Sequence, residues 1–166
     1  GTVRSMNIAH SLCTGLYRMN FAADDALFDS SVLTSLAKSL REKQPDTVGV
    51  YGSAVCCNEL LEPTSVYFTS PEECAEANKM TAKEQYIKLA RRCFVLLGGA
   101  AFYSRDFNTF GPYDELFRLI EDWPFLLKVT NNGYRMEYIG RPVLRYRAGG
   151  VSQHSKKTIL SQSEKQ

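Results

Sequence analysis

The chain has 166 residues, of which 44% are hydrophobic and 23% charged, and this composition is typical of one globular domain with a buried core. The formal charge of +2 comes from 20 basic and 18 acidic residues spread along the chain, which excludes a nucleic-acid-binding protein with a strongly basic surface. The longest uncharged apolar stretch, residues 93–103, is about half of the roughly 20 residues that a membrane-spanning helix needs. We therefore expect a cytoplasmic protein without a membrane span.

The five cysteines indicate reduced thiols rather than a disulfide framework. Their number is odd, they show no C-x-x-C spacing, and the neighbours Cys56 and Cys57 cannot easily bridge to each other. The sequence also lacks internal repeats, and its only low-complexity segment is the polar C-terminal end. We predict one domain over residues 1–152, followed by a polar tail over residues 153–166.

The first elements in chain order alternate between helix and strand. Residues 2–13 carry apolar side chains at helical spacing, and Gly15 ends this predicted helix. Residues 16–25 predict a strand that ends in small residues and two acids, after which Asp29 can cap a second helix. The apolar face of that helix consists of Val32, Leu33, Leu36 and Leu40.

The middle of the chain predicts further strands and one helix. Residues 47–57 and 65–69 are rich in β-branched residues and predict two strands, while residues 81–92 predict a helix. Residues 95–105 predict a buried strand that Gly98 and Gly99 interrupt. Glycines inside a strand indicate either that a ligand approaches the backbone closely or that packing requires a bend, and both explanations remain open.

The last predicted elements are a helix and two short strands. The helix follows a turn at residues 111–112 and runs to Asn132 and Gly133, which suit a C-terminal cap. Strands are predicted over residues 134–140 and 142–148. This alternation indicates an α/β fold with a sheet flanked by helices.

Two adjacent acids, Glu121 and Asp122, stand where that last helix begins. Pro124 lacks a backbone N–H and fits only the first turn of a helix, so the helix starts at about Asp122, which is then a natural N-terminal cap. The helix dipole favours an ionised carboxylate there by roughly 0.3–1 kcal/mol, and a fixed anion of this kind can accept a proton. The alternative is that Asp122 only caps the helix and Glu121 only faces water.

A second acidic pair, Asp24 and Asp25, ends the strand predicted over residues 16–25. Open α/β sheets bind their ligands at the carboxyl ends of their strands. Hard cations such as Mg²⁺ take one or two carboxylates, with other ligands from water and substrate phosphates. The pair therefore predicts a divalent-cation site, and the alternative is a pair that only forms a turn or a cap.

The order of these motifs resembles the family 2 glycosyltransferases, which are inverting enzymes of the GT-A fold that use nucleotide-sugars. Residues 1–29 look like the family's segment that runs from a helix into the Asp-x-Asp strand end, with Asn7 and Gly15 at matching spacing. Residues 98–152 are similar to its later half: the Gly-Gly strand, the Gly-x-x-Asp-Glu turn, the Glu-Asp pair, the "NNGY" cap and the final "YR…GGVS". The resemblance implies a partial GT-A, Rossmann-like mixed sheet.

The resemblance also implies an activity, namely transfer of a sugar from a nucleotide-diphosphate donor to an acceptor hydroxyl with inversion. Asp24 and Asp25 match the motif that holds the diphosphate through Mn²⁺ or Mg²⁺. Asp122 matches the general base that removes the acceptor proton, with Glu121 beside it. The residues that the resemblance assigns to substrate binding are Asn7, Asp25, Gly98 and Gly99.

The expected partners are the nucleotide-sugar donor and a glycan or lipid-linked acceptor in cell-surface polysaccharide or glycoconjugate assembly, with no nucleic acid. The sequence departs from the family pattern at three places. Ala22 replaces the first Asp of the Asp-x-Asp motif, Met6 replaces an Arg, and residues 148–150 replace a His after the final Tyr-Arg. Metal binding is thus left to Asp24 with Asp25 as its neighbour.

The family's first strands, which hold the nucleotide, would precede residue 1. We therefore expect a partial domain whose exposed sheet edge could pair with a second copy, and poor turnover by these 166 residues alone. One alternative is a non-catalytic interaction module on a degenerate glycosyltransferase scaffold. Another is a hydrolase that uses Asp24 and Asp122 as a carboxylate pair. Residues 57–80 are the region where acceptor contacts or a mere surface excursion are expected.

Overall fold

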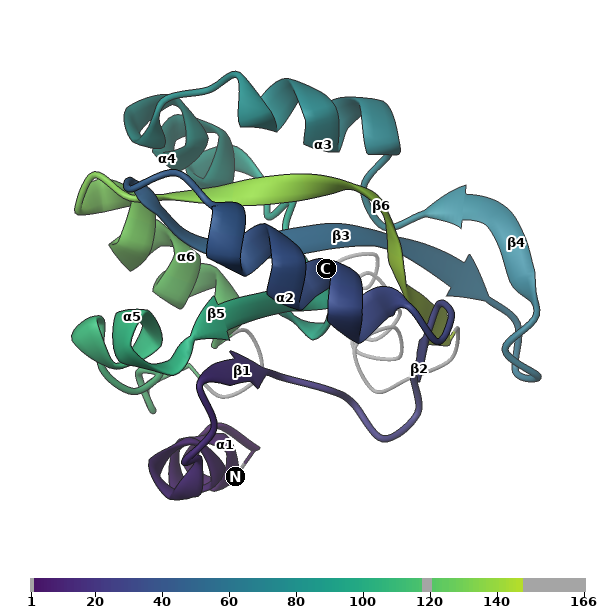
Figure 1. The fold of residues 1–166 in the computed structure, drawn as a ribbon, viewed down its shortest axis with the longest axis horizontal. Helices are drawn as coiled ribbons and strands as arrows, with labels where there is room; N and C mark the ends of the chain where they lie inside the picture. The colour runs from purple at the N-terminus through teal and green to yellow at the C-terminus, as the bar shows by residue number, and fades with distance from the viewer. Residues whose placement is uncertain (1, 118–120, 148–166) are drawn as a thin grey trace, which may run out of the picture.

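The computed structural model describes residues 2–117 and 121–147, and two long parallel strands, β3 (Thr47–Cys57) and β6 (Arg135–Arg147), form its centre (Figure 1). The shorter strands are β1 (Tyr17–Met19), β2 (Ala26–Leu27), β4 (Pro63–Tyr67) and β5 (Ala100–Tyr103). β5 runs antiparallel to β3 and carries β1 at the edge of the sheet. β2 pairs with the end of β6, and β4 pairs with the end of β3. The sheet is therefore mixed.

Helices cover both faces of this sheet (Figure 1). They are α1 (Thr2–Leu12), α2 (Val32–Glu42), α3 (Pro71–Asn78), α4 (Ala82–Arg91), α5 (Ser104–Thr109) and α6 (Asp122–Asn131). α2 buries Val32 and Leu40 against Val50 of β3. The next residue, Tyr51, belongs to the cluster on the other face, where α3, α4 and α6 pack. The predicted α/β class, a mixed sheet flanked by helices, is confirmed.

Gln85 fastens α4 to the sheet from a fully buried position. Its side-chain NH₂ donates to the carbonyl oxygens of Ala77 (3.0 Å) and Met136 (2.9 Å), and its amide oxygen accepts from the Met136 N–H (3.0 Å). A buried amide is tolerated when its hydrogen bonds are made, and here three of them are. One side chain thus joins α3, α4 and β6.

The long elements match the sequence predictions, and the short ones do not. The helices predicted over residues 2–13, 81–92 and from Asp122 onwards are confirmed as α1, α4 and α6, and the strand over residues 47–57 is confirmed as β3. The helices α3 and α5 were not predicted separately. Each has eight residues or fewer, too few to show a clear helical period.

The strand predicted over residues 16–25 is wrong in length, because only β1 forms. Its partner β5 has four residues, since Leu97–Gly99 fold into a 3₁₀ turn, η1, instead of continuing the strand. β1 therefore finds three pairing partners and the chain then leaves the sheet. The strand predicted over residues 95–105 is shortened for the same reason.

Two further predictions near β6 and α2 also differ. The two strands predicted over residues 134–140 and 142–148 are one strand, in which Gly140 adopts a positive φ of 78° and bends the chain without breaking it. Asp29 does not cap α2, whose N-cap is Ser31. The Asp29 carboxylate instead accepts from the Ser31 N–H (2.9 Å) and pairs with Arg141.

Among the described residues, no helix is long and apolar enough to cross a membrane. The five cysteines are unpaired. The predicted domain boundary at residue 152 and the tail over residues 153–166 lie outside the described residues. β1 does form an edge of the sheet, but pairing of that edge with a second copy stays a prediction.

Candidate active site

Asp24 and Asp25 lie in a turn between β1 and β2, which we call the acid turn. The turn closes with a hydrogen bond from the Asp25 N–H to the Ala22 carbonyl (3.2 Å). The end of β6 then holds it in place: the Arg147 N–H donates to Asp25 Oδ1 (3.1 Å), and the Arg147 Nε donates to the Asp24 carbonyl oxygen (2.7 Å). The predicted position at a strand end is therefore wrong. Hydrogen bonds from Arg147, which is distant in the sequence, position the two acids instead.

The two carboxylates of the acid turn differ in environment. Asp24 is exposed, whereas Asp25 is half-buried. Burial raises the pKa of Asp25, the Arg147 N–H opposes this shift, and the charge of Asp24 raises the pKa further. Two adjacent carboxylates fit a divalent cation, which would offset the repulsion that helps to raise the pKa of Asp25.

The acid turn can supply only part of a coordination shell. Among residues 2–117 and 121–147, no three His, Cys, Asp or Glu side chains form a group that could hold a metal ion. A cation held by Asp24 and Asp25 would therefore need oxygen ligands from water or a bound diphosphate, as Mg²⁺ sites commonly have. These residues fit such a substrate-assisted site and do not fit a closed, all-protein site.

The two glycines of η1 have different neighbours. A Cβ added at Gly99 would lie 3.0 Å from Val143 Cγ2 and 3.3 Å from the Gly52 carbonyl, so a larger residue there would press against the sheet. A Cβ at Gly98 would lie 4.0 Å from Asp25 Oδ2 and 3.3 Å from a Leu144 methyl. Gly98 therefore lies beside the acid turn, and Gly99 serves the packing of η1.

Asp122 is the first residue of α6, and Glu121 occupies the N-cap position. The predicted start of the helix is right, but Asp122 does not cap it, and the Glu121 side chain makes no capping hydrogen bond either. Asp122 Oδ1 accepts from the Trp123 N–H (2.9 Å). Both carboxylates thus stand at the positive end of the helix dipole.

The Asp122 carboxylate is poised to exchange a proton near neutral pH. Burial raises its pKa to about 6, the charge of Glu121 adds to this effect, and the Trp123 N–H opposes it. A general base works best when its pKa lies near the working pH, so a value near 6 suits the predicted role. A strongly shifted carboxylate is also a recognised sign of a functional site.

Tyr113 interacts both with Asn7, which the resemblance assigns to substrate binding, and with this acidic pair. The Asn7 side-chain amide donates to the Tyr113 carbonyl (2.9 Å) and accepts from the Tyr113 N–H (2.9 Å), while Asn20 donates to the Tyr113 hydroxyl (2.7 Å). Burial raises the pKa of Tyr113, and the charges of Asp122 and Glu121 raise it further. Asn7 therefore positions Tyr113 near the acids, and its contact with substrate stays a prediction.

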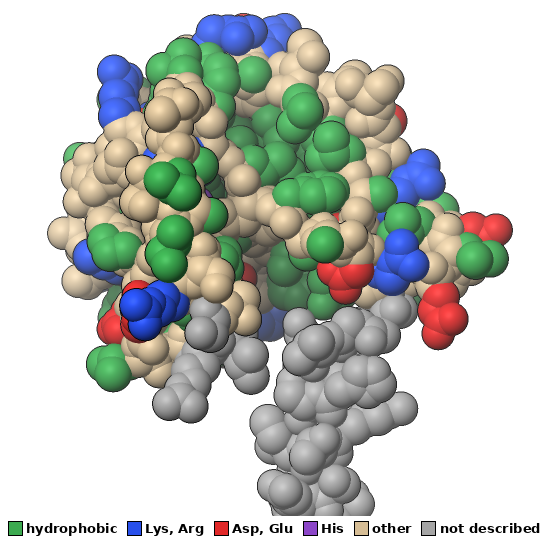
Figure 2. All heavy atoms as spheres, turned by 90° about the horizontal axis from the view of Figure 1, so that it is seen from below, with side chains coloured by type: hydrophobic (Ala, Val, Ile, Leu, Met, Phe, Trp, Pro, Cys, Tyr) green, Lys and Arg blue, Asp and Glu red, His purple; other side chains and the backbone are tan. Residues whose placement is uncertain are grey.

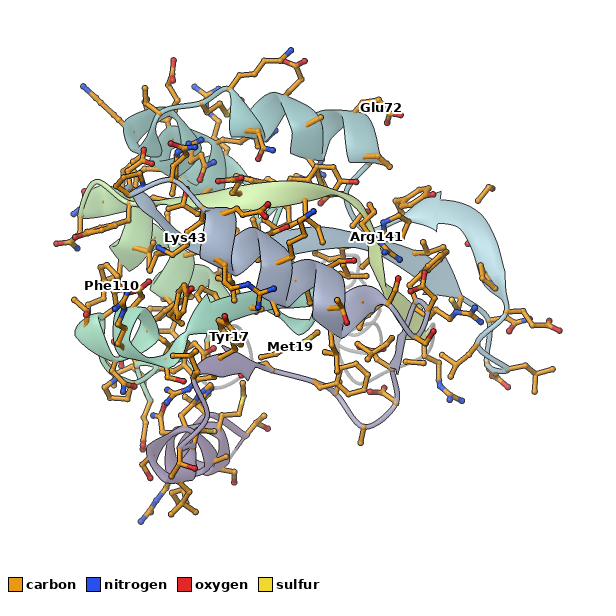
Figure 3. The ribbon with its side chains drawn as sticks, in the orientation of Figure 1. Tyr17, Met19, Lys43, Glu72, Phe110 and Arg141 are labelled. Carbon is orange, nitrogen blue, oxygen red and sulfur yellow. The ribbon has the colours of Figure 1, made fainter. Side chains whose placement is uncertain are left out.

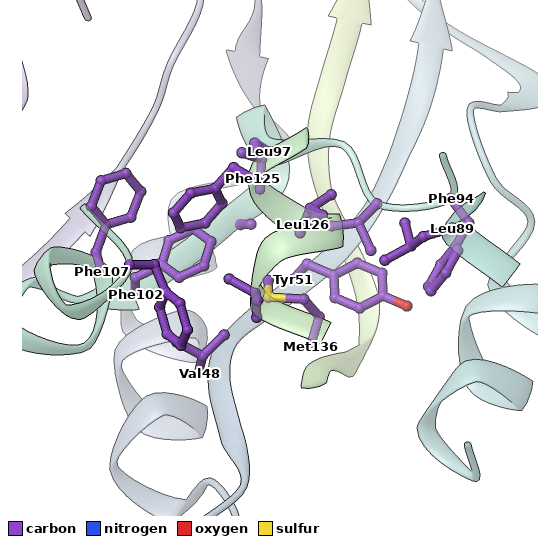
Figure 4. Close-up of a cluster of buried hydrophobic side chains, with 14 of the residues drawn as sticks. Val48, Tyr51, Leu89, Phe94, Leu97, Phe102, Phe107, Phe125, Leu126 and Met136 are labelled. Atoms are coloured by element: carbon purple, nitrogen blue, oxygen red, sulfur yellow. The ribbon is translucent and has the colours of Figure 1, made fainter. Parts of the chain in front are cut away.

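η1 lies next to the acid turn and shares a buried cluster with the first turn of α6. Gly98 adjoins Asp25, and the preceding residue, Leu97, shares a buried cluster with Phe125 of the first turn of α6, next to which it lies in Figure 4. Figure 2 views the molecule from below and shows a hollow with hydrophobic side chains on this face, with acidic side chains at its border. Asp25 and Asp122, both within the described residues, are thus on segments that pack near η1, and no hydrogen bond between their side chains is found.

The loop after β3 also reaches the acid turn. Arg147 Nη1 donates to the Glu59 carbonyl (2.6 Å), and Arg145 Nη1 donates to the Leu61 carbonyl (3.4 Å). Leu60, between these two anchor points, has 79% of its surface exposed. The region predicted for acceptor contacts therefore begins beside the candidate site.

Sequence reasoning missed Arg147, Tyr113 and Asn20. Arg147 belongs to the final Tyr-Arg pair, so the motif drew attention to its position but not to its contacts with residues 24, 25 and 59. Asn20 and Tyr113 are 93 positions apart and carry no local signal. Such contacts arise only when the chain has folded.

Comparison with known proteins points to one class. No protein-family model matches the chain. Over 133 residues, however, it is 24% identical to proteins that are named as glycosyltransferases, and this distant similarity supports the glycosyltransferase part of the resemblance.

Two of the matching proteins are the "PGL/p-HBAD biosynthesis glycosyltransferase" of Mycobacterium tuberculosis and that of Mycobacterium bovis. The match covers 80% of this chain and 44% of each relative, so the chain spans less than half the length of the curated relatives it matches.

Proposed function

We propose that the chain is part of a family 2-like, GT-A glycosyltransferase that transfers a sugar from a nucleotide-diphosphate donor to an acceptor hydroxyl with inversion. The observation that carries this proposal is the Asp122 carboxylate at the start of α6, whose pKa is raised to about 6, together with the carboxylate pair of the acid turn, which Arg147 holds in place beside Gly98. The distant similarity to named glycosyltransferases supports it independently.

In this proposal Asp122 acts as the general base. Its ionised carboxylate accepts the proton of the acceptor hydroxyl as the hydroxyl oxygen attacks the anomeric carbon of the donor. The C–O bond to the new sugar forms while the bond to the diphosphate breaks, and the diphosphate leaves with the electron pair. Glu121 keeps the local potential negative, which holds the Asp122 pKa high and makes the carboxylate a better proton acceptor.

In this proposal the acid turn stabilises the diphosphate that leaves the donor. Asp24 and Asp25 would hold Mn²⁺ or Mg²⁺, which when bound neutralises negative charge on the departing diphosphate. Arg147 fixes both aspartates through their backbone and side-chain oxygens. Gly98 leaves room for a ligand beside Asp25, because it has no side chain to fill that space.

The acceptor is proposed to be a glycan or a lipid-linked molecule in cell-surface polysaccharide or glycoconjugate assembly, and the location to be the cytoplasm. The printed names of the relatives refer to PGL/p-HBAD biosynthesis, which supports a glycoconjugate product. The exposed Leu60 and the loop that Arg147 fastens beside the acid turn offer an apolar surface for such an acceptor.

A second candidate is a non-catalytic module on the same scaffold. It is favoured by Ala22, which is exposed at the place of the first Asp of the family's Asp-x-Asp motif and leaves the acid turn with only two carboxylates. On this hypothesis the turn binds neither a cation nor a nucleotide.

Calorimetric titration with UDP and Mn²⁺ separates the two candidates. The enzyme hypothesis expects UDP binding that depends on Mn²⁺ and that Asp24→Ala weakens by about tenfold or more, the equivalent of about 1.4 kcal/mol. The matched control is Glu42→Ala, which removes an exposed carboxylate from the end of α2. Equal affinities for Asp24→Ala and Glu42→Ala, or no UDP binding both by the folded chain and by a form extended at the N-terminus with the nucleotide-holding strands, would favour the non-catalytic module.

A further inference from the structure

A cavity of 420 Å³ lies at the end of the sheet where β3 begins. It is lined by Leu40, Arg41, Lys43, Gln44, Pro45, Thr47, Val48, Tyr103, Arg105, Asp106, Thr109, Phe110 and Tyr134. Figure 3 labels Lys43 and Phe110 at this end of the molecule. The acid turn lies at the other end of β3, beside Cys57, on the order of 30 Å away at about 3.3 Å per residue. None of the predicted catalytic or metal residues lines the cavity.

The charges that line this cavity do not cancel. Lys43 pairs with Asp106 at 3.1 Å, and both side chains are mostly buried, with 13% and 23% of their surfaces exposed. Lys43 also donates to the Thr47 carbonyl oxygen. The Asp106 carboxylate also faces Arg105, so the three cations Arg41, Lys43 and Arg105 share one carboxylate and leave a net charge of +2 among the side chains that line the cavity.

Asp106 and Tyr103 hold the cations in place. The second carboxylate oxygen of Asp106 lies 3.4 Å from Arg105 Nε, and the Arg105 guanidinium lies 5.1 Å from the centre of the Tyr103 ring. Partial burial and a hydrogen bond with Tyr17 raise the pKa of Tyr103, whereas the charges of Arg105 and Arg41 lower it. Both guanidinium groups therefore act at the Tyr103 hydroxyl, at one side of the cavity.

We propose that this cavity binds a phosphomonoester. A phosphomonoester carries about 1.5 to 2 negative charges at neutral pH, which matches the net charge of +2 on the lining side chains, whereas a carboxylate would neutralise only half of that charge. Guanidinium forks bind phosphate oxygens in pairs of hydrogen bonds. Small-molecule sites occupy roughly 300–1,000 Å³, and the cavity of 420 Å³ lies within this range. The site is separate from the proposed transfer site and does not depend on it.

Calorimetric titration with phenyl phosphate tests the proposal. EDTA is added because it removes divalent cations and so prevents cation-dependent binding at the acid turn. Benzoate, with one negative charge, serves as the ligand control. The variant Arg41→Ala/Arg105→Ala removes two of the three cations that line the cavity, and Lys38→Ala/Arg91→Ala removes two exposed cations elsewhere. Both variants are first checked for folding by circular dichroism, and Arg41→Gln is the milder substitute if the first double variant fails to fold.

The expected result is that phenyl phosphate binds more tightly than benzoate, and that Arg41→Ala/Arg105→Ala loses at least about tenfold in affinity while Lys38→Ala/Arg91→Ala keeps it. Equal affinity of the two double variants, or loss of binding in Asp24→Ala/Asp25→Ala, overturns the proposal. A parallel sedimentation assay with phosphatidylcholine vesicles that contain phosphatidic acid separates the sources. Vesicle binding that needs Arg41 and Arg105 identifies a lipid headgroup, and binding of the soluble probe alone identifies a free phosphomonoester.

Discussion

Replacing Asp122 with Asn is expected to stabilise the protein at neutral and alkaline pH and to leave its stability almost unchanged in acid. Asp122 stands partly buried at the start of α6 beside Glu121. Its folded-state pKa of about 6 lies above the ordinary value of 3.8, so folding favours the protonated form. That contribution is complete below the unfolded pKa and is lost as the pH rises through the folded pKa.

The size of the effect follows from the two pKa values. They differ by about two pH units, and each unit corresponds to about 1.36 kcal/mol. The ionised carboxylate therefore destabilises the fold by about 3 kcal/mol, and the loss develops between about pH 4 and pH 7. A neutral amide at this position carries no charge to bury, so the variant avoids this loss.

Urea unfolding at a series of pH values measures the difference. Trp123, the only tryptophan of the chain, donates from its indole N–H to the Leu89 carbonyl at 2.7 Å and reports the packing of α6 on α4 by fluorescence. Circular dichroism provides a second signal. The control is Glu42→Gln, which makes the same acid-to-amide change at an exposed carboxylate at the end of α2.

A pH-independent effect of Asp122→Asn on stability would contradict the raised pKa of Asp122. If the unfolding free energies of Asp122→Asn and the parent chain differ by the same amount at pH 4 and at pH 8, then the carboxylate ionises in the folded protein as it does in water. Asp122 would then lack the shifted pKa on which its proposed role as a general base depends.

Three further substitutions test the fold and the candidate site. Gly52→Ala should destabilise the protein by roughly 1–3 kcal/mol in urea unfolding, since the new Cβ would lie 2.3 Å from a Val143 methyl; a change below about 0.5 kcal/mol would contradict the tight packing. Gln85→Leu should cost roughly 1–3 kcal/mol for each backbone group of Ala77 and Met136 left unpaired, and a neutral effect would show that water replaces the amide. Gly98→Ala should keep the fold but weaken UDP and Mn²⁺ binding in calorimetry, and unchanged binding would remove η1 from the proposed site.

The long elements of the fold could be predicted because their signals are local. The run of β-branched and small residues over 47–57 specifies a buried strand without reference to the rest of the chain. The two-glycine segment at residues 98–99 could not be read in the same way. A glycine pair permits a bend or a straight strand, and the close approach of Val143 and Gly52 to Gly99, which only the folded sheet contains, explains the glycine there.

The candidate site shows the same division between local and distant information. Pro124 fixes the start of α6 from sequence alone, and this places Glu121 and Asp122 correctly at its N-terminus. The sequence does not reveal how deeply Asp122 is buried, and burial is the main cause of its raised pKa. The acid turn was predicted at a strand end because the pairing of β1 with the short strand β5, which limits β1 to three residues, is invisible in the sequence.

The Arg147 side chain links the acid turn to the loop after β3. One side chain reaches the Asp24 carbonyl and the Glu59 carbonyl, so the acid turn and the loop after β3 cannot move apart unless that side chain lets go of one of them. A ligand that displaces the guanidinium would break this link between the loops, while the Arg147 N–H would still hold Asp25 and Arg145 would still hold Leu61. Events on the diphosphate side of the proposed reaction would therefore be felt at the surface proposed for the acceptor, with a single arginine as the link.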